Sequence, residues 1–302
     1  MLENSLEKKY PLFYKTCCYL RNTFFYRDIF SLCEQIPFNY SLAEKLCQDA
    51  LKVCNSDWNT YAKKLDNLLK INIEFLKLQA SLEKNGAYLY STFREIEGLE
   101  QGYLWGLYFS QIFWAAHHRA FNFFLKEFVR KSGRTGRCLD APVGSGMFLT
   151  QFLLTNKNWS GAGVDLSAAS TDFAENIFRI NRLAGRVKLF NEDFHKFESA
   201  DIFERIICAE FLEHVEDPVV VLRKLRALLS DTGKIFLTTV AWAAFIDHIY
   251  LYKNVSEIRD HISLSGLKIE KEYIQNIFDK DKGKLEDSKI ALNYAAILTK
   301  FT

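Results

Sequence analysis

The fold is decided by the stretch Arg137-Cys-Leu-Asp-Ala-Pro-Val-Gly-Ser-Gly-Met-Phe-Leu149, in which an apolar run, a glycine-rich turn and a second apolar run follow one another directly. This order predicts a short buried strand, a tight loop and the start of a helix. Gly144 and Gly146 can adopt backbone angles closed to other residues, and the free N–H groups that open the helix would face the same space. The loop is therefore a candidate ligand site, although ordinary tight turns also contain Gly-x-Gly.

Two acidic residues at later strand ends strengthen the ligand interpretation. Asp165 closes the run Gly161-Ala-Gly-Val-Asp165, about 20 residues after Gly146, the separation at which nucleotide-binding α/β units place a carboxylate on ribose hydroxyls. Asp193 closes the next strand-like run and could accept a hydrogen bond from an adenine amino group. A dinucleotide is disfavoured, because Leu149 occupies the position of the third glycine in Gly-x-Gly-x-x-Gly.

Taken in order, these segments resemble the class I S-adenosylmethionine-dependent methyltransferases, whose first motif is an acid, a glycine-rich loop and a helix. Asp140 to Gly146 is similar to that motif, with Pro142 where the first glycine is usual. The resemblance covers about residues 125 to 302 and continues through four further segments: Gly163–Ser167, Glu192–Phe194, Ala209–Pro218 and Gly233–Thr239.

Strand-like and helix-like segments alternate regularly after residue 136, which predicts a parallel sheet with helices on both faces. The resemblance implies an α/β, Rossmann-like, doubly wound sheet of seven strands, with an antiparallel edge strand from a terminal hairpin. The expected strands lie near 137–141, 161–165, 186–191, 205–209, 233–239, 266–273 and 290–299. The expected helices lie near 147–155, 168–183, 217–229 and 255–264.

The first part of the chain lacks this alternation and carries helical patterns, which predict an all-helical N-terminal domain. Ser41-Leu-Ala-Glu44 has the form of a capping box, and apolar residues recur at helical spacing from Trp58 toward Glu83. A further apolar helical run from 102 to 131 would connect it to the sheet. We expect a helical cap or connector domain over residues 1–131 and a methyltransferase domain over 132–302. Whether the helices cap a substrate or only pack is left open.

Composition excludes several classes of protein. The chain has 302 residues, 49% hydrophobic and 25% charged, with a formal charge of +2, which gives no general reason to expect a nucleic-acid or membrane partner. The seven cysteines form no Cys-x-x-Cys pair and follow no signal-like segment. We therefore expect a cytoplasmic protein, as a monomer or homodimer.

The methyl group of S-adenosylmethionine is already activated by its sulfonium, so the protein must mainly hold cofactor and acceptor in line. The resemblance implies this cofactor and the residues that bind it. Asp165 would accept both ribose hydroxyls. Asp193 would accept the adenine amino group, with Phe194 against the ring.

The same resemblance places the methionine end of the cofactor on the backbone of Gly144 and Gly146. Asp140 would orient that loop or contact the ammonium group, and Glu210 would lie beside the methionine moiety. Glu210 and Glu213 are the only acidic residues near this point that could chelate a hard cation, so no metal is expected.

The segment after the fifth strand combines aromatic residues with an Asp-His pair, which suits an apolar, planar or acyl-bearing acceptor with one ionisable nucleophile. His248 is the predicted general base, with His214 in reserve. Trp242, Tyr250 and Tyr252 are predicted to contact the acceptor.

Gln111, Trp114 and His118 fall on one face of the helical run before the loop and could reach the same pocket, although packing of Trp114 in the core is an alternative.

The sequence thus predicts an enzyme that methylates a small molecule, free or bound to a carrier protein. Oxygen is favoured over nitrogen or carbon as the methylated atom. Such a reaction fits natural-product or quinone-like biosynthesis. The alternative is a non-catalytic protein that binds S-adenosylmethionine as an interaction partner or scaffold. A nucleic-acid substrate is disfavoured, because no Asn-Pro-Pro-Tyr-like segment follows the fourth strand.

Overall fold

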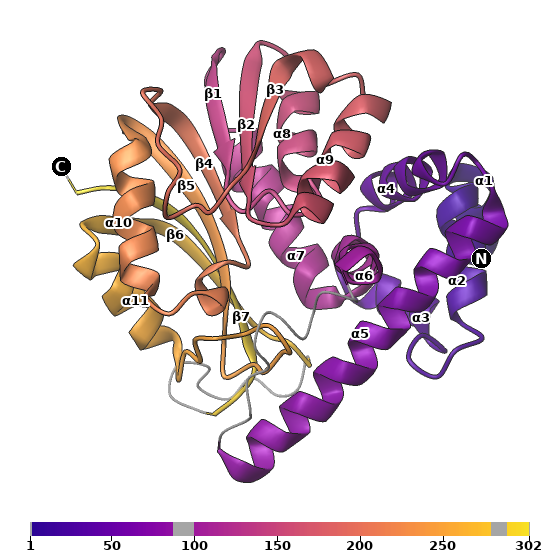
Figure 1. Cartoon of the computed structure of the whole chain (residues 1–302). Helices are drawn as coiled ribbons and strands as arrows, with labels where there is room; N and C mark the ends of the chain where they lie inside the picture. Colours follow the sequence, from indigo (N-terminus) through magenta and orange to yellow (C-terminus); the bar gives the residue numbers. More distant parts are fainter. Residues whose placement is uncertain (1, 87–99, 279–288, 302) are drawn as a thin grey trace.

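The computed structural model describes residues 2–86, 100–278 and 289–301. A twisted sheet with helices beside it forms one part of the molecule, and the N-terminal helices lie against it (Figure 1). Among the helices in these ranges, none combines the length and the apolar character needed to cross a membrane.

The sheet has seven strands in the order β3-β2-β1-β4-β5-β7-β6. The first five strands pair in parallel, and β7 runs antiparallel to both β5 and β6. The expected doubly wound sheet with an antiparallel edge is confirmed, with β6 at the edge and β7 inserted beside it. The strands are β1 (Gly136–Asp140), β2 (Trp159–Asp165), β3 (Val187–Asn191), β4 (Phe203–Ala209), β5 (Leu229–Ala241), β6 (Leu267–Asn276) and β7 (Leu292–Lys300).

Four helices follow the strands, and three begin at a polar cap. Ser167, Asp217 and Asn254 each accept backbone N–H groups from the first turn, which satisfies donors that would otherwise lack partners. The strand order reverses between β1 and β4, so the loops at their carboxyl ends diverge and leave a crevice. The helices are α8 (Met147–Thr155), α9 (Ala168–Ile180), α10 (Pro218–Leu228) and α11 (Val255–Leu264).

The N-terminal helices differ from the sequence expectation in two places. The predicted capping box is wrong: Asn39 caps α4, while Glu44 accepts the backbone N–H of Phe13 at 2.7 Å. The helical run from 102 to 131 is broken at Trp114, which is extended. The elements are α1 (Leu2–Lys9), α2 (Pro11–Leu20), α3 (Ile29–Gln35), α4 (Tyr40–Val53), α5 (Trp58–Asn85), α6 (Glu100–Phe113), α7 (Ala115–Phe123) and a π-helical segment, η2 (Phe124–Val129).

The helical region and one face of the sheet share a hydrophobic core. Side chains of α2, α4, α5 and α6 are continuous with those of α8, α9 and the strands. The ring centroids of Trp105 and Phe173 are 4.8 Å apart, and those of Phe124 and Phe236 are also 4.8 Å apart. A second core under α10 and α11 fills the other face, as expected for strands buried on both sides.

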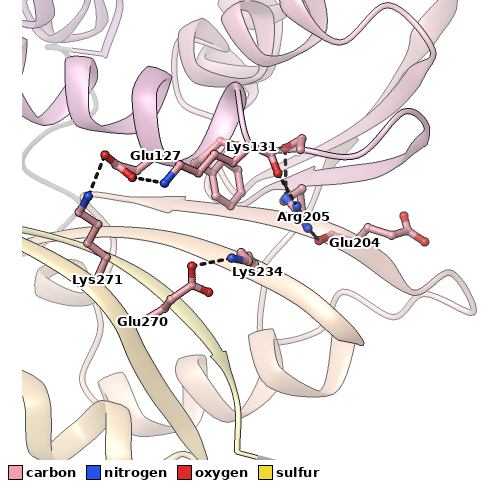
Figure 2. Close-up of polar contacts among 9 residues, drawn as sticks. Glu127, Lys131, Glu204, Arg205, Lys234, Glu270 and Lys271 are labelled. Carbon is pink, nitrogen blue, oxygen red and sulfur yellow. Dashed lines mark hydrogen bonds and ion pairs between the residues drawn. The ribbon is translucent and has the colours of Figure 1, made fainter.

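A polar cluster also joins the π-helical segment to the sheet (Figure 2). The carboxylate of Glu127 lies 2.7 Å from Nζ of Lys131 and 2.8 Å from Nζ of Lys271 on β6. These two ion pairs hold the pKa of Glu127 down at about 2. The contact therefore connects the last turn of the helical region to the edge strand.

Candidate active site

A cavity of about 1190 Å³ lies at the carboxyl ends of the parallel strands. Its floor is formed by the loops after β1 to β5, and its opposite wall by α3, α5, α6 and the start of α7. Ligand sites in open α/β sheets occur at this edge, beside the reversal of strand order. The helical region therefore contributes to the site as well as to the core.

The glycine-rich loop presents its backbone to the cavity at one of its two glycines. Gly144 has a φ of +48°, and a Cβ added there would meet nothing within 4 Å, so this face of the loop is open to a ligand. Gly146 differs: a Cβ would lie 2.9 Å from Cβ of Ala174 on α9. The expected ligand contact of Gly146 is not supported, because this glycine permits close packing of α8 on α9.

Asp165 lies at the cavity and braces the glycine loop. Its Oδ2 accepts the Gly144 N–H and its Oδ1 the Ser167 N–H, both at 2.9 Å. Burial raises the pKa of Asp165, and the two backbone donors oppose that shift. The carboxylate thus stands at the end of β2 where the sequence predicted a ribose contact.

Asp140 is buried beneath the loop and does not line the cavity. Burial raises the pKa of this carboxyl well above its ordinary value, opposed by the backbone N–H of Leu149. Its expected contact with an ammonium group is not supported, because the side chain lies under the loop. Orientation of the loop is the role that its position allows.

Asp193 and Phe194 line the cavity one strand farther along the edge. Oδ1 of Asp193 accepts the His195 N–H at 2.9 Å. The buried ring of Phe194 packs edge-on against Phe211, with centroids 5.8 Å apart. A carboxylate and an aromatic face therefore stand together at the expected end of the site.

Two glutamates occupy the cavity after β4. Glu210 has an unusual backbone φ of +50°. Its N–H donates a hydrogen bond to Thr238 Oγ1 at 3.0 Å, which holds the backbone in this conformation. Glu213 is fully buried, and its Oε2 accepts the Thr239 hydroxyl at 2.7 Å. Burial is the main cause that raises the pKa of each carboxyl to about 7.

His214 and His248 meet Glu213 in the cavity. One ligand atom from each of these three residues lies within 4.8 Å of the others. The imidazole rings are 5.2 Å apart, and burial lowers the pKa of His248 to about 4. Sequence reasoning considered a metal only at Glu210 and Glu213, because no local pattern links His248 to them. The assembled set of two imidazoles and a carboxylate could hold a metal ion.

Asp247 lies beside this cluster. Its Oδ2 accepts the Tyr103 hydroxyl at 2.5 Å and lies 3.7 Å from Nδ1 of His214. Tyr103 comes from α6, so the helical region also supports the polar end of the cavity.

Gln111 and Trp114 line the cavity as expected, but His118 does not. Nε2 of His118 accepts the Asn39 N–H at 2.9 Å, and the ring stacks on Phe38. The break at Trp114 changes the phase of the helix, so His117 faces the cavity instead. The expectation that His118 contacts an acceptor is therefore wrong.

The aromatic residues predicted after β5 also point elsewhere. Trp242 packs with Leu82 and Ala244, and Tyr252 lies in the core under α11. The Tyr250 hydroxyl donates to Glu257 at 2.7 Å. The chain folds back after β5, with the Trp242 N–H bonded to the Tyr252 carbonyl at 2.8 Å. None of these three side chains lines the cavity.

Other aromatic residues form the apolar wall that sequence reasoning missed. Phe75 on α5 lies against Phe278 and Phe245, with ring centroids 5.7 and 6.3 Å away. Phe75 continues the helical spacing of apolar residues in α5, so this spacing could have indicated that it faces the interior. Phe278 follows β6 with no pattern of its own.

Residues 113–269 match a family described as "Methyltransferase domain". A ubiquinone biosynthesis O-methyltransferase of Xanthomonas oryzae pv. oryzae is 29% identical over 111 residues, which is 34% of this chain and 43% of that protein. The Coxiella burnetii protein of the same name is 30% identical over 103 residues, or 32% and 42%. The matched stretches thus span less than half of these relatives.

Solved structures share the fold. An O-methyltransferase from neocarzinostatin biosynthesis, solved with S-adenosylmethionine and 2-hydroxy-5-methyl naphthoic acid, covers 81% of this chain and 74% of its own, with a TM-score of 0.53 and 14% identity. For the N,N-8-amino-8-demethyl-D-riboflavin dimethyltransferase of Streptomyces davawensis, the match covers 76% of this chain and 69% of that protein, with a TM-score of 0.55 and 14% identity. At this identity the likeness concerns the fold alone.

Proposed function

The chain belongs to the methyltransferase-domain family, and from this premise we propose that it transfers the methyl group of S-adenosylmethionine to an oxygen atom of a small, mainly apolar acceptor. The observation that carries the proposal is the cavity. At about 1190 Å³ it exceeds the roughly 300–1,000 Å³ of a pocket for one ligand. It therefore offers room for a cofactor and an acceptor side by side.

The residues at one end fit the cofactor. The open face of Gly144 allows the backbone to be approached, and Asp165 borders the same space. An ionised carboxylate has about four lone-pair sites, and a hydroxyl can rotate to another partner. Asp165 accepts two backbone N–H groups and the Ser170 side chain, so lone-pair sites remain for the ribose hydroxyls. Asp193 and Phe194 then serve the adenine ring. The bound cofactor supplies a methyl group made electrophilic by its sulfonium.

The other end suits an apolar acceptor with one polar group. Phe75, Phe245 and Phe278 form an aromatic wall, and Glu213, His214 and His248 stand at its polar side. This chain's task is to hold the nucleophile against the methyl carbon and to keep water out. The two relatives matched by sequence are ubiquinone biosynthesis O-methyltransferases, which supports oxygen as the methylated atom and a quinone-like or natural-product acceptor.

The test is transfer of label from methyl-labelled S-adenosylmethionine to a panel of phenols, amines and carrier-protein-bound acyl groups, followed by mass spectrometry. We expect labelled product from phenolic members. Cofactor binding without transfer to any member would favour the alternative of a non-catalytic binding protein. Failure to bind S-adenosylmethionine at all would overturn the proposal.

A further inference from the structure

We infer that Glu213, His214 and His248 form a binding site for a divalent transition-metal ion of the zinc type, at the acceptor end of the cavity. The site itself stands on its own geometry, and only the ion's part in turnover rests on the proposed function. It revises the expectation of a metal-free protein, which considered the two glutamates alone.

The three side chains are close enough to share one ion. Their ligand atoms lie within 4.8 Å of one another. Zinc binds nitrogen and oxygen at about 2.0–2.2 Å, so two ligands of one tetrahedral ion lie roughly 3.3–3.6 Å apart. Binding of one ion would therefore require the side chains to move together, by about 1 Å at their ligand atoms.

Both imidazoles are held in the tautomer in which Nε2 is the nitrogen that would bind a metal. Nδ1 of His214 lies 2.9 Å from the carbonyl oxygen of Asp247, and Nδ1 of His248 lies 3.1 Å from that of Ala243. A carbonyl only accepts, so each Nδ1 carries the proton and each Nε2 a lone pair. Metal-binding histidines usually donate their second ring N–H to a carbonyl or carboxylate in this way.

The carboxylates around these rings favour a cation. Oε1 of Glu213 and Oδ1 of Asp247 are buried and have no hydrogen-bond partner in the described part of the chain. Burial of such an oxygen without a partner is costly. A divalent ion would satisfy Oε1 of Glu213.

The ligand types decide which metal fits. Two imidazoles and one carboxylate suit zinc and similar transition metals, whereas magnesium and calcium prefer oxygen ligands throughout. Three protein ligands leave a fourth position for water or substrate, and this one would face the cavity.

An ion held by Glu213, His214 and His248 would lie beside an acceptor hydroxyl at that open position. It would lower the pKa of the hydroxyl, and the proton would leave to solvent. A bond then forms between the acceptor oxygen and the methyl carbon as the carbon–sulfur bond breaks, and its electron pair stays on sulfur. The products are the methyl ether, S-adenosylhomocysteine and one proton. His248 acts here as a ligand instead of the general base expected from the sequence.

The experiment uses the whole chain, freed of metal with a chelator and titrated with zinc by calorimetry, with bound metal counted by elemental analysis. We expect one ion per chain at the site. Glu213→Gln and His248→Ala should each weaken zinc binding by at least about 10- to 100-fold, the effect seen when even supporting residues of metal sites are changed. His261→Ala is the matched control, because this histidine lies outside the cavity and packs beside Tyr252.

Folding and function are separated by two further readouts. Zinc should raise the melting temperature of the wild type and of His261→Ala but not of Glu213→Gln. His214→Ala, at a less buried position, should behave like Glu213→Gln if a buried variant fails to fold. A wild type that binds no zinc, or zinc binding unchanged in all three site variants, overturns the inference. Label transfer that persists without zinc also removes the ion's part in turnover while leaving the proposed function in place.

Discussion

At the scale of single residues, Asp165 braces the glycine loop and lines the end of the cavity that we propose binds the cofactor. We predict that Asp165→Ala raises the dissociation constant for S-adenosylmethionine by about 10² to 10⁴. Two hydrogen bonds to a charged group, each about 1.5 to 3 kcal/mol, are lost while the ribose hydroxyls stay buried. Calorimetric titration measures this directly.

The control is Asp172→Ala, an exposed carboxylate on the following helix. It should leave cofactor affinity unchanged. An unaltered dissociation constant in Asp165→Ala would show that the ribose contact is assigned to the wrong residue.

Glu127 gives a prediction about acid stability. Lys131 and Lys271 depress its pKa to about 2 in the folded protein, below its ordinary value of about 4.3. A depressed folded-state pKa contributes stability above the unfolded pKa, and this contribution is lost as pH falls through the folded value. Glu127→Gln should therefore lower the urea midpoint at pH 7, and the difference from wild type should shrink from about pH 4.5 toward pH 2.

Glu270→Gln provides the comparison in the same cluster (Figure 2). Glu270 pairs with Lys234 at 2.6 Å but is half-exposed, and exposed pairs contribute about 0–1 kcal/mol. The urea midpoint of Glu270→Gln should differ little from that of the wild type, both at pH 7 and toward pH 2. Equal shifts in both variants would show that burial of Glu127 has no special effect.

The positions of site residues were predictable from the sequence where they depend on a single strand and the loop that follows it. Asp165 and Asp193 stand where parallel strands end, because that edge is common to all such strands. The grouping of Glu213 with His248 was not predictable. It depends on how the chain folds back after β5, and nothing local in the sequence encodes that path.

At the scale of elements, α5 contributes Asn72, Phe75 and Leu76 to the part of the cavity that we propose binds the acceptor. We predict that Phe75→Ala raises the acceptor KM by about 10- to 100-fold, since loss of apolar contact in a pocket costs about 1–3 kcal/mol. Cofactor affinity should be preserved, because the ring of Phe75 lies against the rings of Trp114, Phe245 and Phe278.

The matched variant is Lys77→Ala, exposed on the same helix. It should leave both constants unchanged. If Phe75→Ala weakens cofactor and acceptor binding together, the residue supports the whole fold and does not belong to the acceptor wall alone.

Element boundaries show which local rules the tertiary structure overrode. The helices at 147–155 and 255–264 have the expected bounds, because the spacing of their apolar residues and the residues that flank them indicate the same ends. The Ser41 capping box failed, because Glu44 is drawn to the first turn of α2 instead. The break at Trp114 means that Gln111 and His118 do not share one helix face. A prediction that assumed one continuous helix therefore placed His118 in the cavity, where His117 lies instead.

At the scale of the whole molecule, the proposed division into residues 1–131 and 132–302 describes sequence pattern more than independent stability. Phe13, Leu46 and Tyr61 belong to the same core as Phe152 and Ile177. Removal of the first helices would therefore expose a large apolar surface, and such surfaces promote aggregation. The helical region is best tested within the intact chain.

We predict that the intact chain unfolds in one cooperative transition. Trp58, Trp105 and Trp114 report on the helical region, and Trp159 and Trp242 on the other. Tryptophan fluorescence and far-ultraviolet circular dichroism should therefore give coincident melting curves. S-adenosylmethionine at about 100 times its dissociation constant should stabilise the chain by about 2.7 kcal/mol and shift both curves together. If the regions were independently stable, the cofactor would raise only the transition of the part that carries Asp165, and the fluorescence curve would split in two.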